Sequence, residues 1–116
     1  MTYARIEGTG HSTPKAHVSN MELTQYVDTT DEWIKSRTGI GNRYISTGET
    51  ATSLAVSAAQ EALKRANVKP EDIDLIIVAT ISPEYVMPST ACLVQRDIGA
   101  VNATCFDLGA ACSGFL

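Results

Sequence analysis

The most regular pattern of apolar and polar positions runs from Thr50 to Asn67. Small and apolar residues recur there at steps of three and four, with polar and charged residues between them; they are Leu54, Ala58, Ala59, Ala62, Leu63 and Ala66. This spacing puts them on one face of an α-helix. The pattern therefore predicts a helix, and we expect Pro70 to end it.

A strand-helix-strand unit is predicted after this helix. Ile73 to Thr80 is a nearly continuous aliphatic run, which is typical of a strand covered on both faces in a parallel sheet. Ser89 can cap a helix that continues to Ile98 and stops at Gly99, and Ala103 to Leu108 predicts a second strand. This order of elements indicates an α/β fold.

The first part of the chain is less regular. Ala4 to Glu7 predicts a short strand that enters a turn-rich loop at residues 8–14. Two pairs with capping-box spacing then predict two short helices, the second of them ending at Gly39. The pairs are Ser19 with Glu22 and Thr29 with Glu32.

Small residues follow the second predicted strand, from Gly109 to Gly114, and suit a sharp turn into a new helix. Leu116 is the last residue, so that helix has no length with which to bury a face. We therefore expect residues 1–116 to be one truncated domain that is cut just after this turn.

Charge and hydropathy exclude several classes of partner. The formal net charge is −4, and no basic stripe is available to neutralise a phosphate backbone, so we expect no nucleic-acid binding. The longest apolar run, Leu75 to Ala79, is too short to span a bilayer, and Met1 to Gly10 lacks a basic region followed by an apolar one. We expect no membrane partner and a cytoplasmic location.

The cysteines and histidines do not form a metal-binding pattern. Cys92, Cys105 and Cys112 lack metal-ligand spacing, and His11 and His17 both fall in a polar amino-terminal loop. We predict free thiols and no metal site. Cys92 and Cys105 are interpreted as packing residues, one in a helix and one in a strand.

Cys112 is the strongest candidate for chemistry. A thiol at a helix start lies near unpaired N–H groups, which favour the nucleophilic thiolate. It also follows a strand of a parallel sheet, at the end where such folds bind ligands. From position alone, a nucleophile and a small core residue are equally good interpretations.

Several segments resemble the β-ketoacyl-(acyl carrier protein) synthase III family. Phe106-Asp-Leu-Gly-Ala-Ala-Cys112-Ser-Gly-Phe115 resembles its active-site segment, and Asp28 to Ile40 resembles its coenzyme A binding helix and turn. Ile76 to Thr80 and Pro88 to Cys92 match the core between them. The resemblance extends from Tyr3 to the last residue. It implies a partial thiolase-like fold, the amino-terminal part of the first half, with helices packed on a mixed or parallel sheet.

The resemblance implies an acyltransferase that initiates fatty acid biosynthesis. Cys112 would take an acyl group, commonly acetyl, from coenzyme A, and malonyl-(acyl carrier protein) would lose CO2 and attack it to give 3-oxoacyl-(acyl carrier protein). No permanently bound cofactor is implied, because the coenzyme A thioester is a substrate. The family's catalytic histidine and asparagine have no counterpart here, so we expect the chain alone to be inactive and the full-length protein to be a homodimer.

Further site residues follow from the same resemblance. Trp33 and Arg37 lie four residues apart on one predicted helix and would stack the adenine and hold a phosphate of coenzyme A, with Thr29 beside them. The alternative is a tryptophan packed in the core. Met87 matches the position that bounds the partner subunit's acyl pocket at the dimer interface; the alternative is a loop residue anchored in the core.

Two other functions stay open. The chain can be part of a thiolase-fold acyltransferase of secondary metabolism. It can also be a non-catalytic interaction module that pairs with a separate carboxyl-terminal half.

Overall fold

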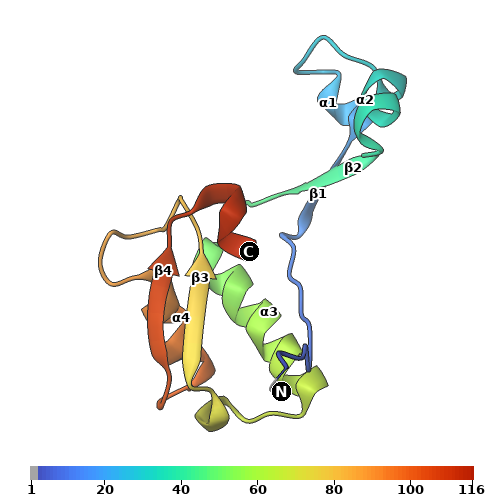
Figure 1. Cartoon of the computed structure of the whole chain (residues 1–116). Coiled ribbons are helices and arrows are strands. Elements are labelled where there is room, and N and C mark those ends of the chain that lie inside the picture. Colours follow the sequence, from blue (N-terminus) through green and yellow to red (C-terminus); the bar gives the residue numbers. More distant parts are fainter. Residues whose placement is uncertain (1–2) are drawn as a thin grey trace. The chain divides into compact units, whose positions relative to one another are not determined.

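The computed structural model describes residues 3–116, and the chain divides into two compact units. Of the described residues, 3–12 and 50–116 form the larger unit, and 13–49 form the smaller unit. The arrangement of elements within each unit is shown in Figure 1. Among the described residues, no helix is both long enough and apolar enough to cross a membrane.

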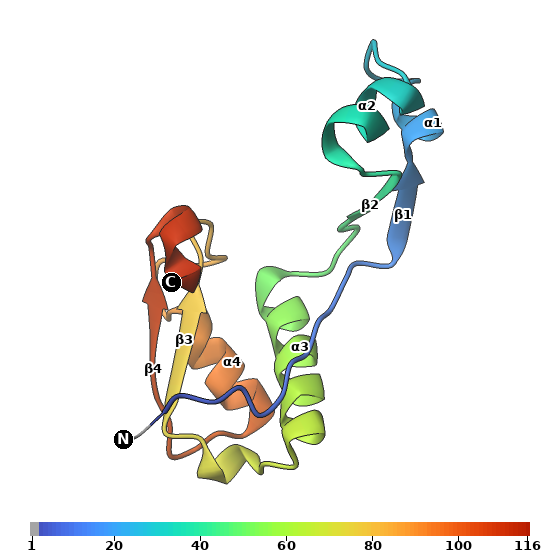
Figure 2. The same ribbon diagram turned by 45° about the vertical axis from the view of Figure 1, so that its right-hand side comes forward.

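The larger unit is built on two parallel strands, β3 (Leu75–Ala79) and β4 (Thr104–Leu108). Their register places Ile77 opposite Phe106. Helix α4 (Thr90–Ile98) connects the strands and packs on one face of this sheet, and α3 (Ala51–Ala66) packs on α4, as the views in Figures 1 and 2 agree. The predicted strand-helix-strand unit and the α/β class are confirmed.

Local capping fixes both helices. The Thr50 hydroxyl accepts a hydrogen bond from the Ser53 N–H at the start of α3, and the Ser89 hydroxyl accepts one from the Cys92 N–H at the start of α4. Gly99, with φ of 80°, ends α4 as predicted. The prediction that Pro70 ends α3 was wrong. The helix ends at Ala66, and Asn67 follows in the left-handed region (φ 55°), before the chain reaches Pro70. Pro70 instead begins the short 3-10 turn η1 (Pro70–Asp72).

The expectation that the aliphatic strand is covered on both faces is wrong for this chain. Side chains on the face toward α4 are half-buried, whereas the large apolar side chains on the opposite face are between 37% and 51% exposed. The exposed large side chains are Leu75, Ile77, Phe106 and Leu108. The physical reason is that the described residues supply helices to one side of the sheet only. The buried apolar core of this unit is correspondingly small, and consists of Ala91, Val94, Ala100 and Ala103.

Ala4 to Glu7 does not form the predicted strand. The chain here pairs with no strand of residues 3–116 and runs beside α3 instead (Figure 2). Contact with α3 is close, since a Cβ added to Gly8 would lie 2.5 Å from the Ala62 carbonyl oxygen. The His11 N–H donates to the Glu61 carboxylate at 2.8 Å and holds the end of this segment.

The smaller unit contains the antiparallel strands β1 (Ala16–Ser19) and β2 (Asn42–Ile45), with α1 (Asn20–Leu23) and α2 (Asp31–Thr38) between them. The strands were not predicted, because four residues of mixed polarity give no alternation to detect. His17 lies in β1, 5.5 Å from the ring centre of Tyr44 on β2, so its assignment to a polar loop was wrong.

A buried asparagine connects the elements of this unit. The Asn20 side-chain amide donates to Asp31 at 2.8 Å and to the Ile40 carbonyl at 2.7 Å, and its oxygen accepts from Arg43. Asn20 is 1% exposed, so these bonds satisfy a polar group that would otherwise be costly to bury. Together with buried Ile34, they fix α2 against the strands.

Candidate functional site

Cys112 lies on a tight turn directly after the parallel sheet. β4 ends at Leu108, and residues Ala111–Phe115 form one 3-10 turn, η2, where the sequence predicted a turn into a helix. Ala111, immediately before the cysteine, has φ of 47°, which is rare for a residue with a side chain. Such backbone conformations concentrate at functional sites, because surrounding structure must hold them in place.

The turn is held against the end of the neighbouring strand. A Cβ on Gly114 would lie 2.9 Å from the Cβ of Ala79, the last residue of β3, so only glycine permits this approach. The Thr80 N–H donates to the Leu108 carbonyl at 3.2 Å and keeps the two strand ends together. Cys112 therefore lies at the carboxyl end of the parallel strands, as the sequence predicted.

Cys112 is exposed and lines an open hollow of about 710 Å3. The walls are mostly small or apolar: Ile77, Ala79, Leu108, Ala111, Gly114, Phe115 and Leu116. The residues that line this hollow include no histidine or other base. No group of three His, Cys, Asp or Glu side chains in this part of the chain is placed to hold a metal ion.

Asp107 positions this turn, and sequence reasoning missed it. Its two carboxylate oxygens accept hydrogen bonds from the Thr90 and Ala91 N–H groups at the start of α4, each at 2.8 Å. The carboxylate thus satisfies two free donors of the helix and fixes β4 just before the Cys112 turn. The available signal was an acidic residue facing inward in an otherwise apolar strand.

The second predicted group lies in the smaller unit, on α2. The Arg37 guanidinium carbon is 4.5 Å from the centre of the Trp33 ring, so the two side chains stack as their spacing predicted. Trp33 is 53% exposed, and the core position of α2 is taken by Ile34. The alternative of a core-packed tryptophan is therefore wrong in this structure.

The cap of α2 differs from the prediction by one residue. Thr30, not Thr29, precedes the helix, and its hydroxyl accepts a hydrogen bond from the Trp33 N–H at 3.1 Å. The Thr29 hydroxyl is left buried without a hydrogen-bond partner among the described residues. By contrast, the predicted capping box of Ser19 and Glu22 is confirmed, and Gly39 ends α2.

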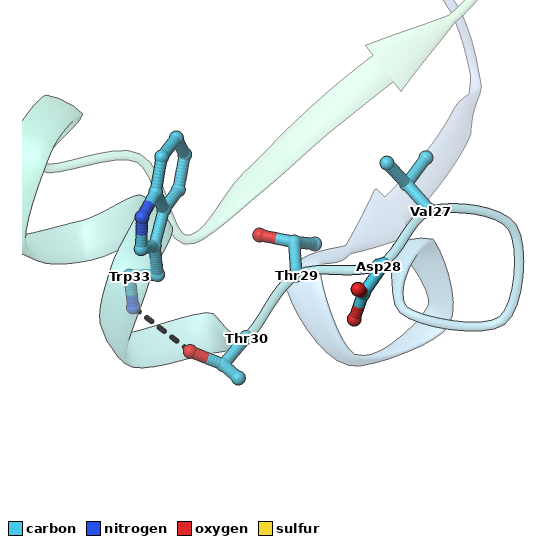
Figure 3. Close-up of a pocket in the computed structure, with 5 residues that line it drawn as sticks. All are labelled: Val27, Asp28, Thr29, Thr30 and Trp33. Atoms are coloured by element: carbon cyan, nitrogen blue, oxygen red, sulfur yellow. Dashed lines mark hydrogen bonds between the residues drawn. The ribbon is translucent and has the colours of Figure 1, made fainter.

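Thr29 and Trp33 line one hollow of about 260 Å3, together with Val27, Asp28 and Thr30. Figure 3 shows the Thr29 hydroxyl on the side where the Trp33 ring lies. An exposed aromatic face and an unpaired hydroxyl are the groups that a planar, hydrogen-bonding ligand needs. Arg37 does not line this hollow and places a positive charge beside it.

Met87 lies in the loop between β3 and α4. Glu84 attaches this loop to α3 by accepting a hydrogen bond from the Thr52 N–H at 2.6 Å, whereas the Met87 side chain is 85% exposed. A core anchor is therefore not its role in this structure. The two groups of site residues belong to different compact units: Cys112 and Met87 to the larger, and Thr29, Trp33 and Arg37 to the smaller.

Comparison with known proteins decides the ancestry. No protein-family model matches the chain. Over all 116 residues, however, it is 54% identical to a protein of Clostridium kluyveri named β-ketoacyl-(acyl carrier protein) synthase III. This chain is a relative of ketoacyl synthase III.

Solved structures agree with the sequence match. The 3-oxoacyl-(acyl carrier protein) synthase III of Aquifex aeolicus superposes on 96% of the chain with a TM-score of 0.91 and 52% identity. The priming β-ketosynthase of the R1128 polyketide pathway also superposes on 96%, with a TM-score of 0.91 and 41% identity. The expected family and the partial thiolase-like α/β fold are confirmed.

The chain spans only part of these relatives. It covers 36% of the Clostridium kluyveri protein, 36% of the Aquifex chain and 34% of the R1128 chain. The expectation that it corresponds to a portion of a ketoacyl synthase III is confirmed.

Proposed function

We propose that the chain supplies the acyl-accepting part of a ketoacyl synthase III, with Cys112 as the nucleophile. The observation that carries this proposal is the placement of Cys112, exposed on a strained turn at the carboxyl end of the parallel strands and lining an open hollow. Nucleophilic residues need such access, because the acyl carbonyl must approach the sulfur closely.

In the proposed reaction, the Cys112 sulfur attacks the carbonyl carbon of an acyl-coenzyme A, commonly acetyl-coenzyme A. A new thioester bond forms, the bond to the coenzyme A sulfur breaks, and the thiol proton of the cysteine ends on coenzyme A. Malonyl-(acyl carrier protein) then loses CO2, and the resulting carbanion attacks the acyl group. The bond from the acyl carbon to the Cys112 sulfur breaks, and the cysteine leaves as a thiolate that takes a proton from water. The product is 3-oxoacyl-(acyl carrier protein), which begins fatty acid biosynthesis.

The hollow on α2 is proposed to bind coenzyme A. Trp33 stacks the adenine, the Thr29 hydroxyl gains the hydrogen bond that it lacks, and Arg37 pairs with a phosphate. Coenzyme A acts here as a substrate carrier, and no permanent cofactor is proposed. Met87, exposed on its loop, is proposed to face a second subunit at the acyl pocket of a homodimer.

The condensation step requires groups outside this chain. An enolate that forms in the second step needs hydrogen-bond donors, and the hollow at Cys112 is lined by apolar side chains. We therefore propose that residues 1–116 are the amino-terminal portion of a longer cytoplasmic domain and complete the cycle only with its remainder.

Mass spectrometry after incubation with acetyl-coenzyme A tests this function. We expect one acetyl group on Cys112, absent from Cys112→Ala and retained in Cys92→Ala. In Arg37→Ala, the acetyl-coenzyme A concentration for half-maximal labelling should rise about tenfold, because a charge-assisted contact is lost. Lys35→Ala removes an equal charge from the same helix and is the matched control. Labelling that survives in Cys112→Ala contradicts the proposed role of Cys112.

Two observations favour the other candidate functions. The match to a polyketide priming ketosynthase favours a condensing enzyme of secondary metabolism, which differs in its acyl substrate. The exposed face of the β3–β4 sheet favours a module that pairs with a separate carboxyl-terminal half. Acylation by longer acyl-coenzyme A thioesters distinguishes the first, and co-purification of a stoichiometric partner distinguishes the second.

A further inference from the structure

Two thiols outside the Cys112 turn touch each other. The Sγ atoms of Cys92, in the first turn of α4, and Cys105, in β4, are 3.3 Å apart. Both residues belong to the larger unit and both are free and half-buried. The sequence indicated only that each packs within its own element, because a helix residue and a strand residue give no sign of mutual contact.

The surroundings make the two sulfurs chemically different. The Ser89 hydroxyl donates to the Cys92 sulfur at 3.1 Å, and this bond, followed by that from Cys105, lowers the pKa of the Cys92 thiol. The first N–H groups of α4 are already bonded to Asp107 and Ser89, and the Asp107 carboxylate opposes the lowering of the Cys92 pKa. Burial is the main cause that raises the pKa of Cys105.

Gln95 fixes the position of Cys105. Its side-chain amide donates to the Ala100 carbonyl at 3.2 Å and to the Ala103 carbonyl at 2.5 Å, so the orientation of the amide is determined. The amide oxygen lies 3.2 Å from the Cys105 sulfur, so Gln95 and Cys92 are alternative acceptors for the single Cys105 S–H. Cys92 is thus the more acidic of two thiols that touch each other, and Cys105 is the neighbour within reach.

We propose that Cys92 and Cys105 are an oxidation site, which hydrogen peroxide converts to an intramolecular disulfide between α4 and β4. The Cys92 thiolate attacks one peroxide oxygen, the O–O bond breaks, and a sulfenic acid and hydroxide form. The Cys105 sulfur then attacks the Cys92 sulfur, and the sulfenic oxygen leaves as water with the thiol proton. Two thiols are oxidised and one peroxide is reduced to two waters.

The disulfide would close a loop over residues 93–104 and join α4 to the strand that leads to Cys112. Only a small movement of the sulfurs is needed, since they are already in contact. Reaction of Cys92 with Cys105 leaves the Cys112 thiol available, so the site separates oxidation from the proposed acyl transfer.

The chain has three cysteines, so three different disulfides can form and their yields can be compared in one sample. The purified chain is treated with an equimolar amount of hydrogen peroxide, its remaining thiols are alkylated, and a non-reducing digest is analysed by mass spectrometry. We expect the Cys92–Cys105 link to exceed either link to Cys112 by about tenfold, because the native fold holds the two sulfurs together. In guanidinium chloride, the Cys105–Cys112 link should dominate, since it closes the shortest loop.

Single substitutions distinguish Cys92, which attacks the peroxide, from Cys105, which then forms the disulfide. In Cys105→Ser, Cys92 should stop at the sulfenic acid and be trapped by dimedone, whereas Cys92→Ser should consume peroxide at a rate at least about fivefold lower. Cys112→Ser should leave the Cys92–Cys105 link unchanged. The proposal is overturned if links to Cys112 dominate in the native chain, if native and denatured patterns agree, or if Cys92 stays reduced while Cys112 is oxidised.

Discussion

At the scale of single residues, the start of α2 assigns different tasks to two adjacent threonines. Thr30 caps the helix, whereas Thr29 lines the hollow beside Trp33 and its hydroxyl is buried without a partner among the described residues. The two residue types are identical, so their order along the chain decides which hydroxyl stabilises the fold and which is left without a partner.

Substitution of these threonines should separate stability from binding. Thr30→Ala should lower the free energy of unfolding of the smaller unit by about 1 kcal/mol, because a helix cap is lost. Thr29→Ala should leave that stability nearly unchanged and weaken coenzyme A binding about fivefold, since one neutral hydrogen bond is lost. The chain has one tryptophan, so Trp33 fluorescence follows both urea unfolding and coenzyme A binding. If the two substitutions lower the free energy of unfolding equally, the assignment of stability to Thr30 and of binding to Thr29 is wrong.

At the scale of elements, α4 is attached to β4 by Asp107. The carboxylate accepts hydrogen bonds from the backbone N–H groups of Thr90 and Ala91, and both bonds are partly buried. The contact determines where the helix starts relative to the strand end that precedes Cys112.

Asp107→Ala should reduce the free energy of unfolding of the larger unit by about 2 kcal/mol, because two N–H groups lose their acceptor. Asp107→Asn keeps one acceptor and should cost about half as much. The control is Asp97→Ala, which removes an exposed ion pair with Arg96 and should change stability by less than about 0.5 kcal/mol. Urea unfolding followed by circular dichroism measures the three values, and similar losses for Asp97 and Asp107 refute the role given to Asp107.

The open ends of β1 and β2 are connected by Glu49. Its carboxylate accepts from the N–H groups of Lys15 and Thr47, each at 3.0 Å. These bonds, that from Lys15 first, lower the pKa of Glu49 from about 4.5 to about 2. Because the folded pKa is below the unfolded one, this stabilisation is present above about pH 4.5 and is lost as the pH falls toward 2.

The melting temperature of the smaller unit should therefore fall between pH 4.5 and pH 2. Glu49→Gln should lower it at pH 6 and flatten this dependence; the part that remains comes from Glu22 and Asp31, whose pKa values are also lowered, chiefly by hydrogen bonds from Ser19 and Lys35. Glu32→Gln, at an exposed position of α2, is the control. Trp33 fluorescence during heating gives the measurement, and an unchanged pH dependence in Glu49→Gln argues against this assignment.

At the scale of the whole molecule, the exposed sheet face has the largest consequence. Ile77 and Phe106 lie opposite each other across the strands and are 49% and 44% exposed, with Leu75 and Leu108 beside them. A contiguous apolar surface of this kind is typical of a contact area, and strand edges favour association.

The isolated chain should therefore self-associate and bind a hydrophobic dye. Phe106→Thr, which keeps a residue suited to strands, should reduce dye fluorescence about twofold and shift the chain toward monomer in light scattering. Val101→Thr, at a 75% exposed turn position away from this face, should change neither. A monomeric chain that binds no dye would show that this face is protected in solution.

The sequence by itself determined the elements whose information is local. The three- and four-residue steps of α3, the caps at Ser19, Ser89 and Gly99, and the aliphatic β3 each depend on neighbouring residues, so each could be predicted. The motif around Cys112 also indicated the family before the comparison did.

The tertiary structure decided what depends on partners distant in sequence. The pairing of β1 with β2, the capping of α4 by Asp107 and the contact of Cys92 with Cys105 join residues that give no sign of each other along the chain. Ala4 to Glu7 shows the converse, since a segment suited to a strand forms one only where another strand offers its hydrogen bonds. Sequence therefore determined the helices and strands that have a regular local pattern, and three-dimensional packing determined the remaining strands and which side chains meet.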